Sequence, residues 1–274
     1  MQQRWLNSTA ESADTSTADR DSRLFIASIA KCFQVLEALN TAGRPVGLTE
    51  LAELSDLDRS GVQRITHTLR TLGYLRQDPV AKSFRLSGRM LEFGHTALAT
   101  HEVRERAQRP LEALNKRTGE TVNLMELEGD DIVYVARWPS IHAISVDLHV
   151  GSRLPAYCTA AGRAILSRMK PEEALSHLKA VHRTAMTEFT VTHLAGLRRL
   201  LDQAREAGYA LNNQEAFIGD ISVSAPLVDS DSRPVAAINI AVPTPRWRLE
   251  DVLAELVQPL LKTAASINRD IRYL

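Results

Sequence analysis

The sequence predicts an α+β protein in which an N-terminal winged helix-turn-helix is joined by a linker helix to a larger domain with an antiparallel sheet. The 274 residues exceed the roughly 100 to 150 that are usual for one domain. Apolar residues recur at helical spacing over residues 26–73, whereas they alternate with period two from residue 121 onward. Between these regions, residues 74–77 and 83–86 have the pattern of a β-hairpin.

The composition is that of an ordinary globular protein, with 44% hydrophobic and 24% charged residues. No apolar run approaches the roughly 18 residues of a membrane span, and the first residues lack the apolar core of a signal peptide. Cys32 and Cys158 lie far apart and form neither a disulfide framework nor a CxxC motif. These features predict a cytoplasmic protein with two free thiols and no membrane contact.

The charge is distributed unevenly, although 33 basic and 33 acidic side chains give a net charge of zero. Residues 20–89 hold eleven basic and seven acidic side chains, a net charge of +4. Residues 1–19 and residues 90–274 each carry a net charge of −2. The balanced total therefore conceals a basic module, which is typical of nucleic-acid binding.

The N-terminal region is predicted to contain a tail and three helices. Residues 1–22 are rich in Ser, Thr, Asp and Ala without apolar periodicity, which predicts a disordered tail. The first helix, over residues 26–40, ends at a Gly-Arg-Pro stop signal. We expect Thr49 to cap the second helix and Asp58 to cap the third, which ends at Gly73. The tight connection between the last two helices is typical of a helix-turn-helix.

The remaining chain alternates between helices and strands. The winged helix-turn-helix is placed at residues 23–89, the linker helix at 90–105 and a C-terminal domain at 106–274. A helix from Glu102 to Gly119 is expected to be interrupted by Pro110. Strands are expected at 121–126, 132–135, 144–148, 222–228 and 235–242, and helices at 160–169, 171–178 and 194–207. The last helix has an apolar stripe over residues 249–267, with a kink at Pro259.

The third helix has two contrasting faces. At 100° per residue, Val62, Ile65, Leu69 and Leu72 form a stripe that should be buried. The opposite face carries side chains that can bond to base edges in a major groove, and no acidic residue that phosphates would repel. With flanking arginines and a basic hairpin, the candidate DNA-binding residues are Arg59, Ser60, Gln63, Arg64, His67, Arg70, Lys82 and Arg85. The alternative is an ordinary solvated helix face.

Several segments resemble the IclR family of bacterial transcription regulators. In the N-terminal region these are residues 29–37, 48–52 and 69–74. Residues 151–166 resemble the effector-domain signature of the family, and residues 208–210 with 219–226 resemble a second signature. The resemblance implies a GAF-like effector-binding and oligomerisation domain at 106–274, and a dimer or a dimer of dimers. The form of residues 151–159 is most similar to the branch that controls aromatic-acid catabolism through protocatechuate and β-ketoadipate.

The resemblance also implies an effector site on the sheet, beside the helix that Thr159 caps. Small residues leave the first-turn amides of that helix open to a carboxylate. The matching positions are Ala160, Ala161, Asn212, Ser222, Asn239 and Ala241, with Arg137 and Arg153 as candidates for pairing with an acid. The family often has an acidic residue at position 212 and small hydroxyls at 239 and 241, so this site differs in polarity. Each of Arg137, Arg153 and Asn239 could instead have a purely structural role.

Catalytic and metal chemistry have little support in the sequence. The eight histidines show no HxxxH or HExxH spacing, and Gly-rich phosphate motifs are absent. No base is placed near Cys158, which favours a small buried thiol over a nucleophile. We therefore predict no catalytic residue, no metal and no cofactor.

The sequence thus predicts a regulator that binds double-stranded operator DNA and responds to a small organic acid. A dimer is expected to contact half-sites one helical turn apart, or a multiple of it. Two alternatives remain open. One is an enzyme whose C-terminal domain acts on a small aromatic or keto acid, and the other is a DNA-binding dimer whose second domain only oligomerises.

Overall fold

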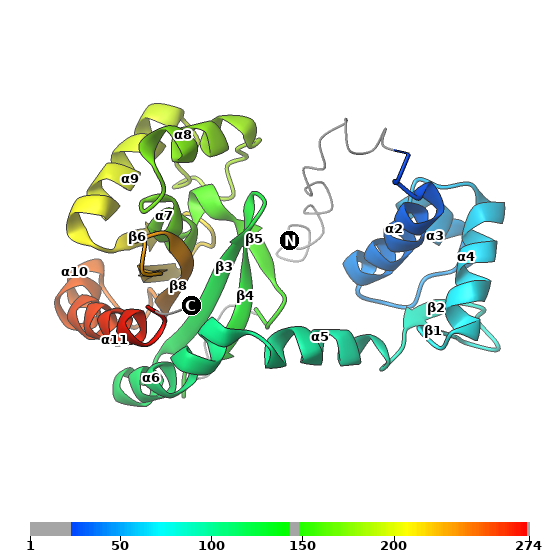
Figure 1. Ribbon diagram of the computed structural model, residues 1–274, viewed down its shortest axis with the longest axis horizontal. Helices are drawn as coiled ribbons and strands as arrows, with labels where there is room; N and C mark the ends of the chain where they lie inside the picture. The colour runs from blue at the N-terminus through cyan, green and yellow to red at the C-terminus, as the bar shows by residue number, and fades with distance from the viewer. Residues whose placement is uncertain (1–22, 143–147, 273–274) are drawn as a thin grey trace. The chain divides into compact units, whose positions relative to one another are not determined.

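The computed structural model describes residues 23–142 and 148–272 (Figure 1). The chain divides into two compact units between Thr100 and His101. The tail predicted at residues 1–22 and most of the strand expected at 144–148 lie outside the described residues. Within the described residues, no helix combines the length and the apolarity that crossing a membrane would require.

The N-terminal unit is a helix-turn-helix followed by a hairpin and one more helix. Its elements are α2 (Ala27–Ala42), α3 (Leu48–Leu54), α4 (Arg59–Thr71), β1 (Leu75–Gln77), β2 (Phe84–Leu86) and α5 (Met90–Ala99). Val35, Leu51 and Val62 are fully buried in a core between α2, α3 and α4. A bridge between Val46 and Phe84 joins the loop before α3 to the hairpin. The winged helix-turn-helix predicted from the sequence is confirmed.

The ends of these helices follow local capping chemistry, with two differences from prediction. The Asp58 carboxylate accepts the amide of Gly61 at 2.8 Å, which confirms the expected cap of α4. Helix α3 begins at Leu48 with Gly47 as its N-cap, two residues earlier than expected, so the predicted Thr49 cap is wrong. Leu72 is 51% exposed because it lies at the end of α4, and Thr66 is buried in the apolar stripe instead.

The C-terminal unit is built around a six-stranded antiparallel sheet with the strand order β5-β4-β3-β8-β7-β6. Its strands are β3 (Thr121–Glu128), β4 (Asp131–Trp138), β5 (Arg153–Pro155), β6 (Ala210–Asn213), β7 (Asp220–Val228) and β8 (Pro234–Pro243). Its helices are α6 (Glu102–Thr118), α7 (Ala160–Leu166), α8 (Pro171–Ala180), α9 (Leu194–Ala207), α10 (Leu249–Asp251) and α11 (Val257–Asp270). The α+β architecture is therefore confirmed.

Helices cover both faces of this sheet (Figure 1). Helices α6 and α11 pack on one face, and α7 packs across β7 and β8 on the other. One prediction about proline was wrong, because helix α6 runs through Pro110 without interruption. In the last helix, a π-helical turn, Val252–Leu256, precedes Pro259, and both features are known causes of helix kinks. The kink at Pro259 stays a prediction.

Candidate functional site

The outer face of α4 is exposed, as the sequence predicted. All eight candidate DNA-binding side chains on α4 and the hairpin are exposed. Two of them also have partners within the unit. The Ser60 hydroxyl donates to Asp58 at 2.6 Å, and Arg70 donates to the Gln77 side chain at 2.9 Å. Arg70 therefore connects α4 to strand β1 of the β1–β2 hairpin. This hairpin, residues 75–86, is the wing.

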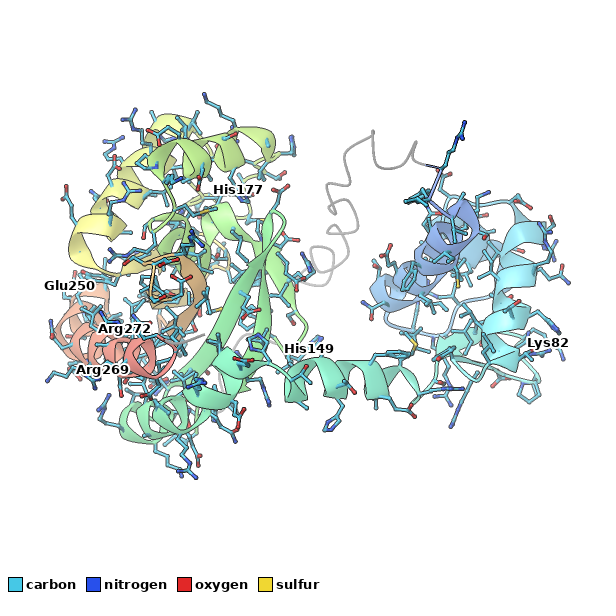
Figure 2. The ribbon with its side chains drawn as sticks, in the orientation of Figure 1. Lys82, His149, His177, Glu250, Arg269 and Arg272 are labelled. Atoms are coloured by element: carbon cyan, nitrogen blue, oxygen red, sulfur yellow. The ribbon has the colours of Figure 1, made fainter. Side chains whose placement is uncertain are left out.

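The wing places cations side by side. Arg76 and Arg85 are directly opposite each other in the antiparallel pair of β1 and β2, so both project from the same face. Lys82 has a φ of 56° at the end of the turn, and its side chain projects from the wing (Figure 2). The Asp78 carboxylate holds the turn by accepting two backbone amides at 2.8 Å. Like charges at opposite positions destabilise a hairpin, which indicates that this face is built to meet anions.

In the C-terminal unit, five of the eight predicted effector residues share one face of the sheet. The register aligns Asn212, Ser222 and Ala241 in one row across β6, β7 and β8. Asn239 and Arg137 lie in the next row on that face. The predicted α7 residues, Ala160 and Ala161, are buried in the helix that packs over this face.

A directed hydrogen-bond chain crosses the second row. Arg137 Nη1 donates to the side-chain oxygen Asn123 Oδ1 at 3.1 Å, and Asn123 Nδ2 donates to Asn239 Oδ1 at 2.7 Å. Within the described residues, the amide nitrogen of Asn239 donates to no acceptor. This series of hydrogen bonds thus ends in the amide nitrogen of Asn239, a donor on the face of the sheet that α7 covers.

Asn212 and Arg153, two of the predicted effector residues, also have hydrogen-bond partners within the unit, and Arg153 does not lie on the face that α7 covers. Asn212 donates to the Cys158 carbonyl at 2.5 Å and accepts the Glu215 amide at 3.1 Å, so it joins β6 to the start of α7. Arg153 bonds to Glu128 and Asp131 at the β3–β4 turn. Because side chains alternate along a strand, the register turns Arg153 away from the face that holds Asn239.

The start of α7 is held tightly against its surroundings. Thr159 accepts the Gly162 amide at 3.2 Å, which confirms the predicted cap. A Cβ at Gly162 would overlap the backbone of Ala156, so only glycine fits there. Arg163, 1% exposed, donates to both carboxylate oxygens of Glu215 and to the Tyr157 carbonyl at 2.9 Å. The sequence analysis missed this buried ion pair, because the burial of Arg163 depends on a partner from a distant segment.

The sequence analysis also missed polar residues on the face of the sheet that α7 covers, among them Asn123, Tyr134 and Asp220. Asn123 and Tyr134 are buried there, and Asp220 begins β7 two residues before Ser222. The period-two pattern could have found Asn123, since it shares the face of the buried Met125. Burial raises the pKa of Asp220 to about 7, while Arg137 acts in the opposite direction.

The thiol of Cys158 is buried, as the sequence analysis favoured. Burial raises the pKa of Cys158 to about 12, which keeps it a neutral thiol at physiological pH. Among the described residues, no group of three or more His, Cys, Asp or Glu side chains could hold a metal ion.

Comparison with known proteins identifies the family. Residues 95–269 match the model described as bacterial transcriptional regulator IclR C-terminal, and residues 28–79 match the IclR helix-turn-helix domain. The chain is 32% identical over 248 residues to the HTH-type transcriptional regulator KdgR of Escherichia coli, covering 90% of this chain and 94% of KdgR. It is 31% identical over 265 residues to the Pca regulon regulatory protein of Pseudomonas putida, covering 96% and 88%.

Solved structures agree with this assignment. A transcriptional regulator from Rhodococcus sp. RHA1 is 33% identical and superimposes with a TM-score of 0.79, covering 90% of this chain and 98% of that one. The matched families and relatives are regulators and not enzymes, which excludes the enzyme alternative. The chain belongs to the IclR family of bacterial transcriptional regulators, with a helix-turn-helix DNA-binding domain followed by an effector domain.

Proposed function

We propose that the chain regulates transcription in the cytoplasm by binding operator DNA as a dimer, and that a small organic acid modulates this binding. The observation that carries the proposal is the exposed, acid-free outer face of α4 beside a wing with facing arginines. A helix between two phosphate backbones needs such a face, and nearby phosphates relieve the repulsion between Arg76 and Arg85.

The exposed side chains divide into two roles. We assign base contacts to Ser60, Gln63, Arg64 and His67 on α4, with Arg64 suited to guanine and Gln63 to adenine. We assign phosphate contacts to Arg59, Arg70, Lys82 and Arg85, which flank that face or lie on the wing. Because Arg70 also bonds to Gln77, it orients α4 as well as contacting the backbone.

The acid is proposed to lie on the face of the sheet that α7 covers, with Arg137 as its cation. Asn239, Ser222 and the first-turn amides of Ala160 and Ala161 provide neutral donors around it. Arg153 and Asn212 contribute indirectly, by holding the edge of the sheet and the start of α7.

An aromatic acid or its ring-cleavage product is the effector class we favour. It is supported by the form of residues 151–159 and by the likeness to the Pca regulon regulatory protein. KdgR is equally similar, so acids that are not aromatic belong in any test.

Exposed apolar side chains support self-association of the N-terminal unit. Ile29 and Phe33 lie one turn apart on α2 and are 51% and 58% exposed. Helix α5 has no buried residue at all, and its Leu91 is 75% exposed. An apolar face of this kind favours a second copy of the chain as its partner, and two copies would set the spacing of two half-sites.

Fluorescence anisotropy tests the DNA-binding roles. The purified chain is titrated onto DNA from upstream of its own gene and onto a scrambled duplex at fixed salt. Arg64→Ala should weaken binding to the first duplex by about 1–3 kcal/mol and leave the second little changed. Lys82→Ala should weaken both and lower the salt slope by about 1. Equal losses on both duplexes for Arg64→Ala would contradict its base-reading role, and Arg233→Ala in the C-terminal unit is the charge-matched control.

The same titration with added acids tests the effector. Protocatechuate, 4-hydroxybenzoate, β-ketoadipate and gluconate are compared at equal concentration. A change in operator affinity with one acid supports modulation, and Arg137→Ala should abolish that change. If binding is specific and no acid alters it, the C-terminal unit only oligomerises, as the remaining alternative holds.

A further inference from the structure

Helix α5 is held at its start rather than along its length. None of its ten residues is buried. Among the described residues, α5 packs extensively on no other helix or strand. The direction that α5 takes from the end of the wing is therefore set by the few contacts at its first turn.

Hydrogen bonds fix the segment before α5 to the end of α4. The Ser87 hydroxyl donates to the Gly73 carbonyl at 2.6 Å, and the Ser87 amide donates to the Tyr74 carbonyl at 2.9 Å. The same hydroxyl accepts the Arg89 amide at 3.2 Å. These bonds fix the place at which α5 begins, whereas its direction depends on side chains.

Two side chains at the start of α5 lie against one ring. Arg89, the N-cap residue of α5, has its guanidinium carbon 4.7 Å from the centroid of the Tyr74 ring. The Phe93 ring, one turn later, has its centroid 5.8 Å from that of Tyr74, with an angle of 37° between the planes. Both distances are typical of attractive cation–π and aromatic contacts. The Tyr74 ring, just after α4, thus contacts α5 at two successive turns.

Arg89 also bonds directly to the end of α4. Its Nη1 donates to the carbonyl of Leu72, the C-cap residue of α4, at 2.5 Å. The last carbonyls of a helix have no partner within the helix, and a cation is favoured beside them. A planar guanidinium that is both stacked on a ring and bonded to a carbonyl has little rotational freedom. Arg89 therefore holds α5 at a definite angle to α4.

We propose that the cluster of Tyr74, Arg89 and Phe93 determines which operators the chain accepts, because it fixes the angle between α4 and α5 and so the separation of the half-sites that a dimer can bind. The inference rests on the proposed function, in which apolar side chains of α2 and α5 join two copies. The angle at Arg89 then sets how the two α4 helices are spaced and rotated. Arg89 is a positioning residue, which acts through α4 and not through contact with DNA.

A fixed angle limits the spacing that a dimer tolerates. B-DNA completes a turn in about 10–10.5 bp, so each inserted base pair rotates one half-site by roughly 35° relative to the other. A dimer with stiff connections must twist the DNA to reach a displaced half-site, whereas a loose connection lets the second copy rotate. The cluster therefore predicts a narrow spacing tolerance, which widens when the cluster is broken.

Binding to duplexes of altered spacing tests the inference. Footprinting of the full chain on DNA from upstream of its own gene locates the two half-sites, and fluorescence anisotropy then measures binding to duplexes with the spacer lengthened. A spacer longer by about two base pairs should weaken wild-type binding about tenfold and Arg89→Ala binding less than about threefold. On a duplex with one half-site scrambled, both chains should bind equally, since the side chains that contact DNA are unchanged.

Three further variants locate the effect. Tyr74→Phe keeps the ring and should keep the wild-type tolerance, whereas Tyr74→Leu should widen it as Arg89→Ala does. Arg44→Ala removes an exposed cation that pairs with Glu50 on α3, and this charge-matched control should leave the tolerance unchanged. Arg89 is itself exposed, so its variant should fold, and thermal melting checks this for every chain.

The outcomes separate this inference from the proposed function. An unchanged spacing tolerance in Arg89→Ala, or an equal loss on the single half-site, would overturn the positioning role while DNA binding stands. If the wild type binds no DNA specifically, the proposed function is wrong, and pulsed EPR between spin labels on Thr68→Cys and Thr96→Cys, in a chain with Cys32→Ser, still tests the angle. We expect a narrow distance distribution that broadens in Arg89→Ala. Equally broad distributions in both chains would overturn the inference.

Discussion

The imidazole of His101 joins the first turn of α6 to the Glu126 carboxylate on β3. Its Nδ1 accepts the Arg104 amide at 3.2 Å, and its Nε2 lies 2.7 Å from Glu126 Oε1. A nitrogen that accepts an N–H carries no proton, so the hydrogen on Nε2 is the one that points to Glu126. One neutral side chain therefore serves as a helix cap and as an anchor to the sheet, at the point where the two units meet in the chain.

His101→Ala should destabilise the C-terminal unit by about 1–2 kcal/mol, since it removes a cap and a hydrogen bond to a carboxylate. Urea unfolding followed by circular dichroism measures the loss. His101→Asn keeps a capping side chain but cannot reach Glu126 in the same way, so it should lie between the wild type and His101→Ala. Equal stability of all three chains would show that the contact contributes nothing.

Glu215→Ala should be among the most damaging single changes in the chain. It leaves the buried Arg163 guanidinium without its carboxylate, and breaking a buried pair from one side costs about 3–5 kcal/mol. Glu112→Ala removes the exposed partner of Lys116 and should cost about 0.5 kcal/mol or less. Thermal melting of both variants compares the two pairs, and similar shifts in Tm would contradict the role given to burial.

Gly162→Ala should destabilise the chain, although helix propensity alone predicts the opposite sign. Replacing glycine inside a helix with alanine ordinarily gains about 0.5–1 kcal/mol. Here the new methyl group meets the backbone of Ala156, which cannot move without displacing Tyr157 and Cys158. A lowered urea midpoint is the expected result, and a raised midpoint would mean that the segment before α7 yields easily.

The contribution of Asp220 to the stability of the C-terminal unit should fall as the pH rises from about 4 to about 7. Burial raises the pKa of Asp220 to about 7, whereas an unfolded aspartate titrates near 3.9. In this window the folded chain binds the extra proton, so raising the pH removes a proton that favours folding. Asp220→Asn should therefore raise Tm at pH 8 relative to the wild type and have less effect at pH 4. The reverse pattern would mean that Asp220 is stabilised as a carboxylate.

Features governed by neighbours in the chain were predictable from the sequence. The Asp58 and Thr159 caps depend on residues three positions away, and the outer face of α4 follows from helical spacing. The errors at Pro110 and Thr49 arose because packing in the unit overrides local propensity. The structure carries α6 through its proline, since the helix is anchored on the sheet along its length.

The face of the sheet that α7 covers, where we propose the effector site, was only partly predictable because strand register assembles it. Period two places Asn123 and Asn239 on inward faces, but only the pairing of β3 with β8 brings the two amides together. Asp220 and Arg137 come from β7 and β4, which are not neighbours in the sheet, so no local pattern links them. The effect of the Arg137 charge on the pKa of Asp220 depends on how helices cover this face of the sheet. The sequence pattern does not predict that packing.

The facing arginines of the wing give the N-terminal unit two salt responses of opposite sign. In the free chain, added electrolyte screens Arg76 from Arg85 and should favour the closed hairpin. On DNA, the same electrolyte competes with the phosphates and weakens the complex. The slope of a plot of the logarithm of operator affinity against the logarithm of salt concentration should therefore be shallower at low ionic strength. There, part of the binding free energy offsets the repulsion between the two arginines when the β1–β2 hairpin forms.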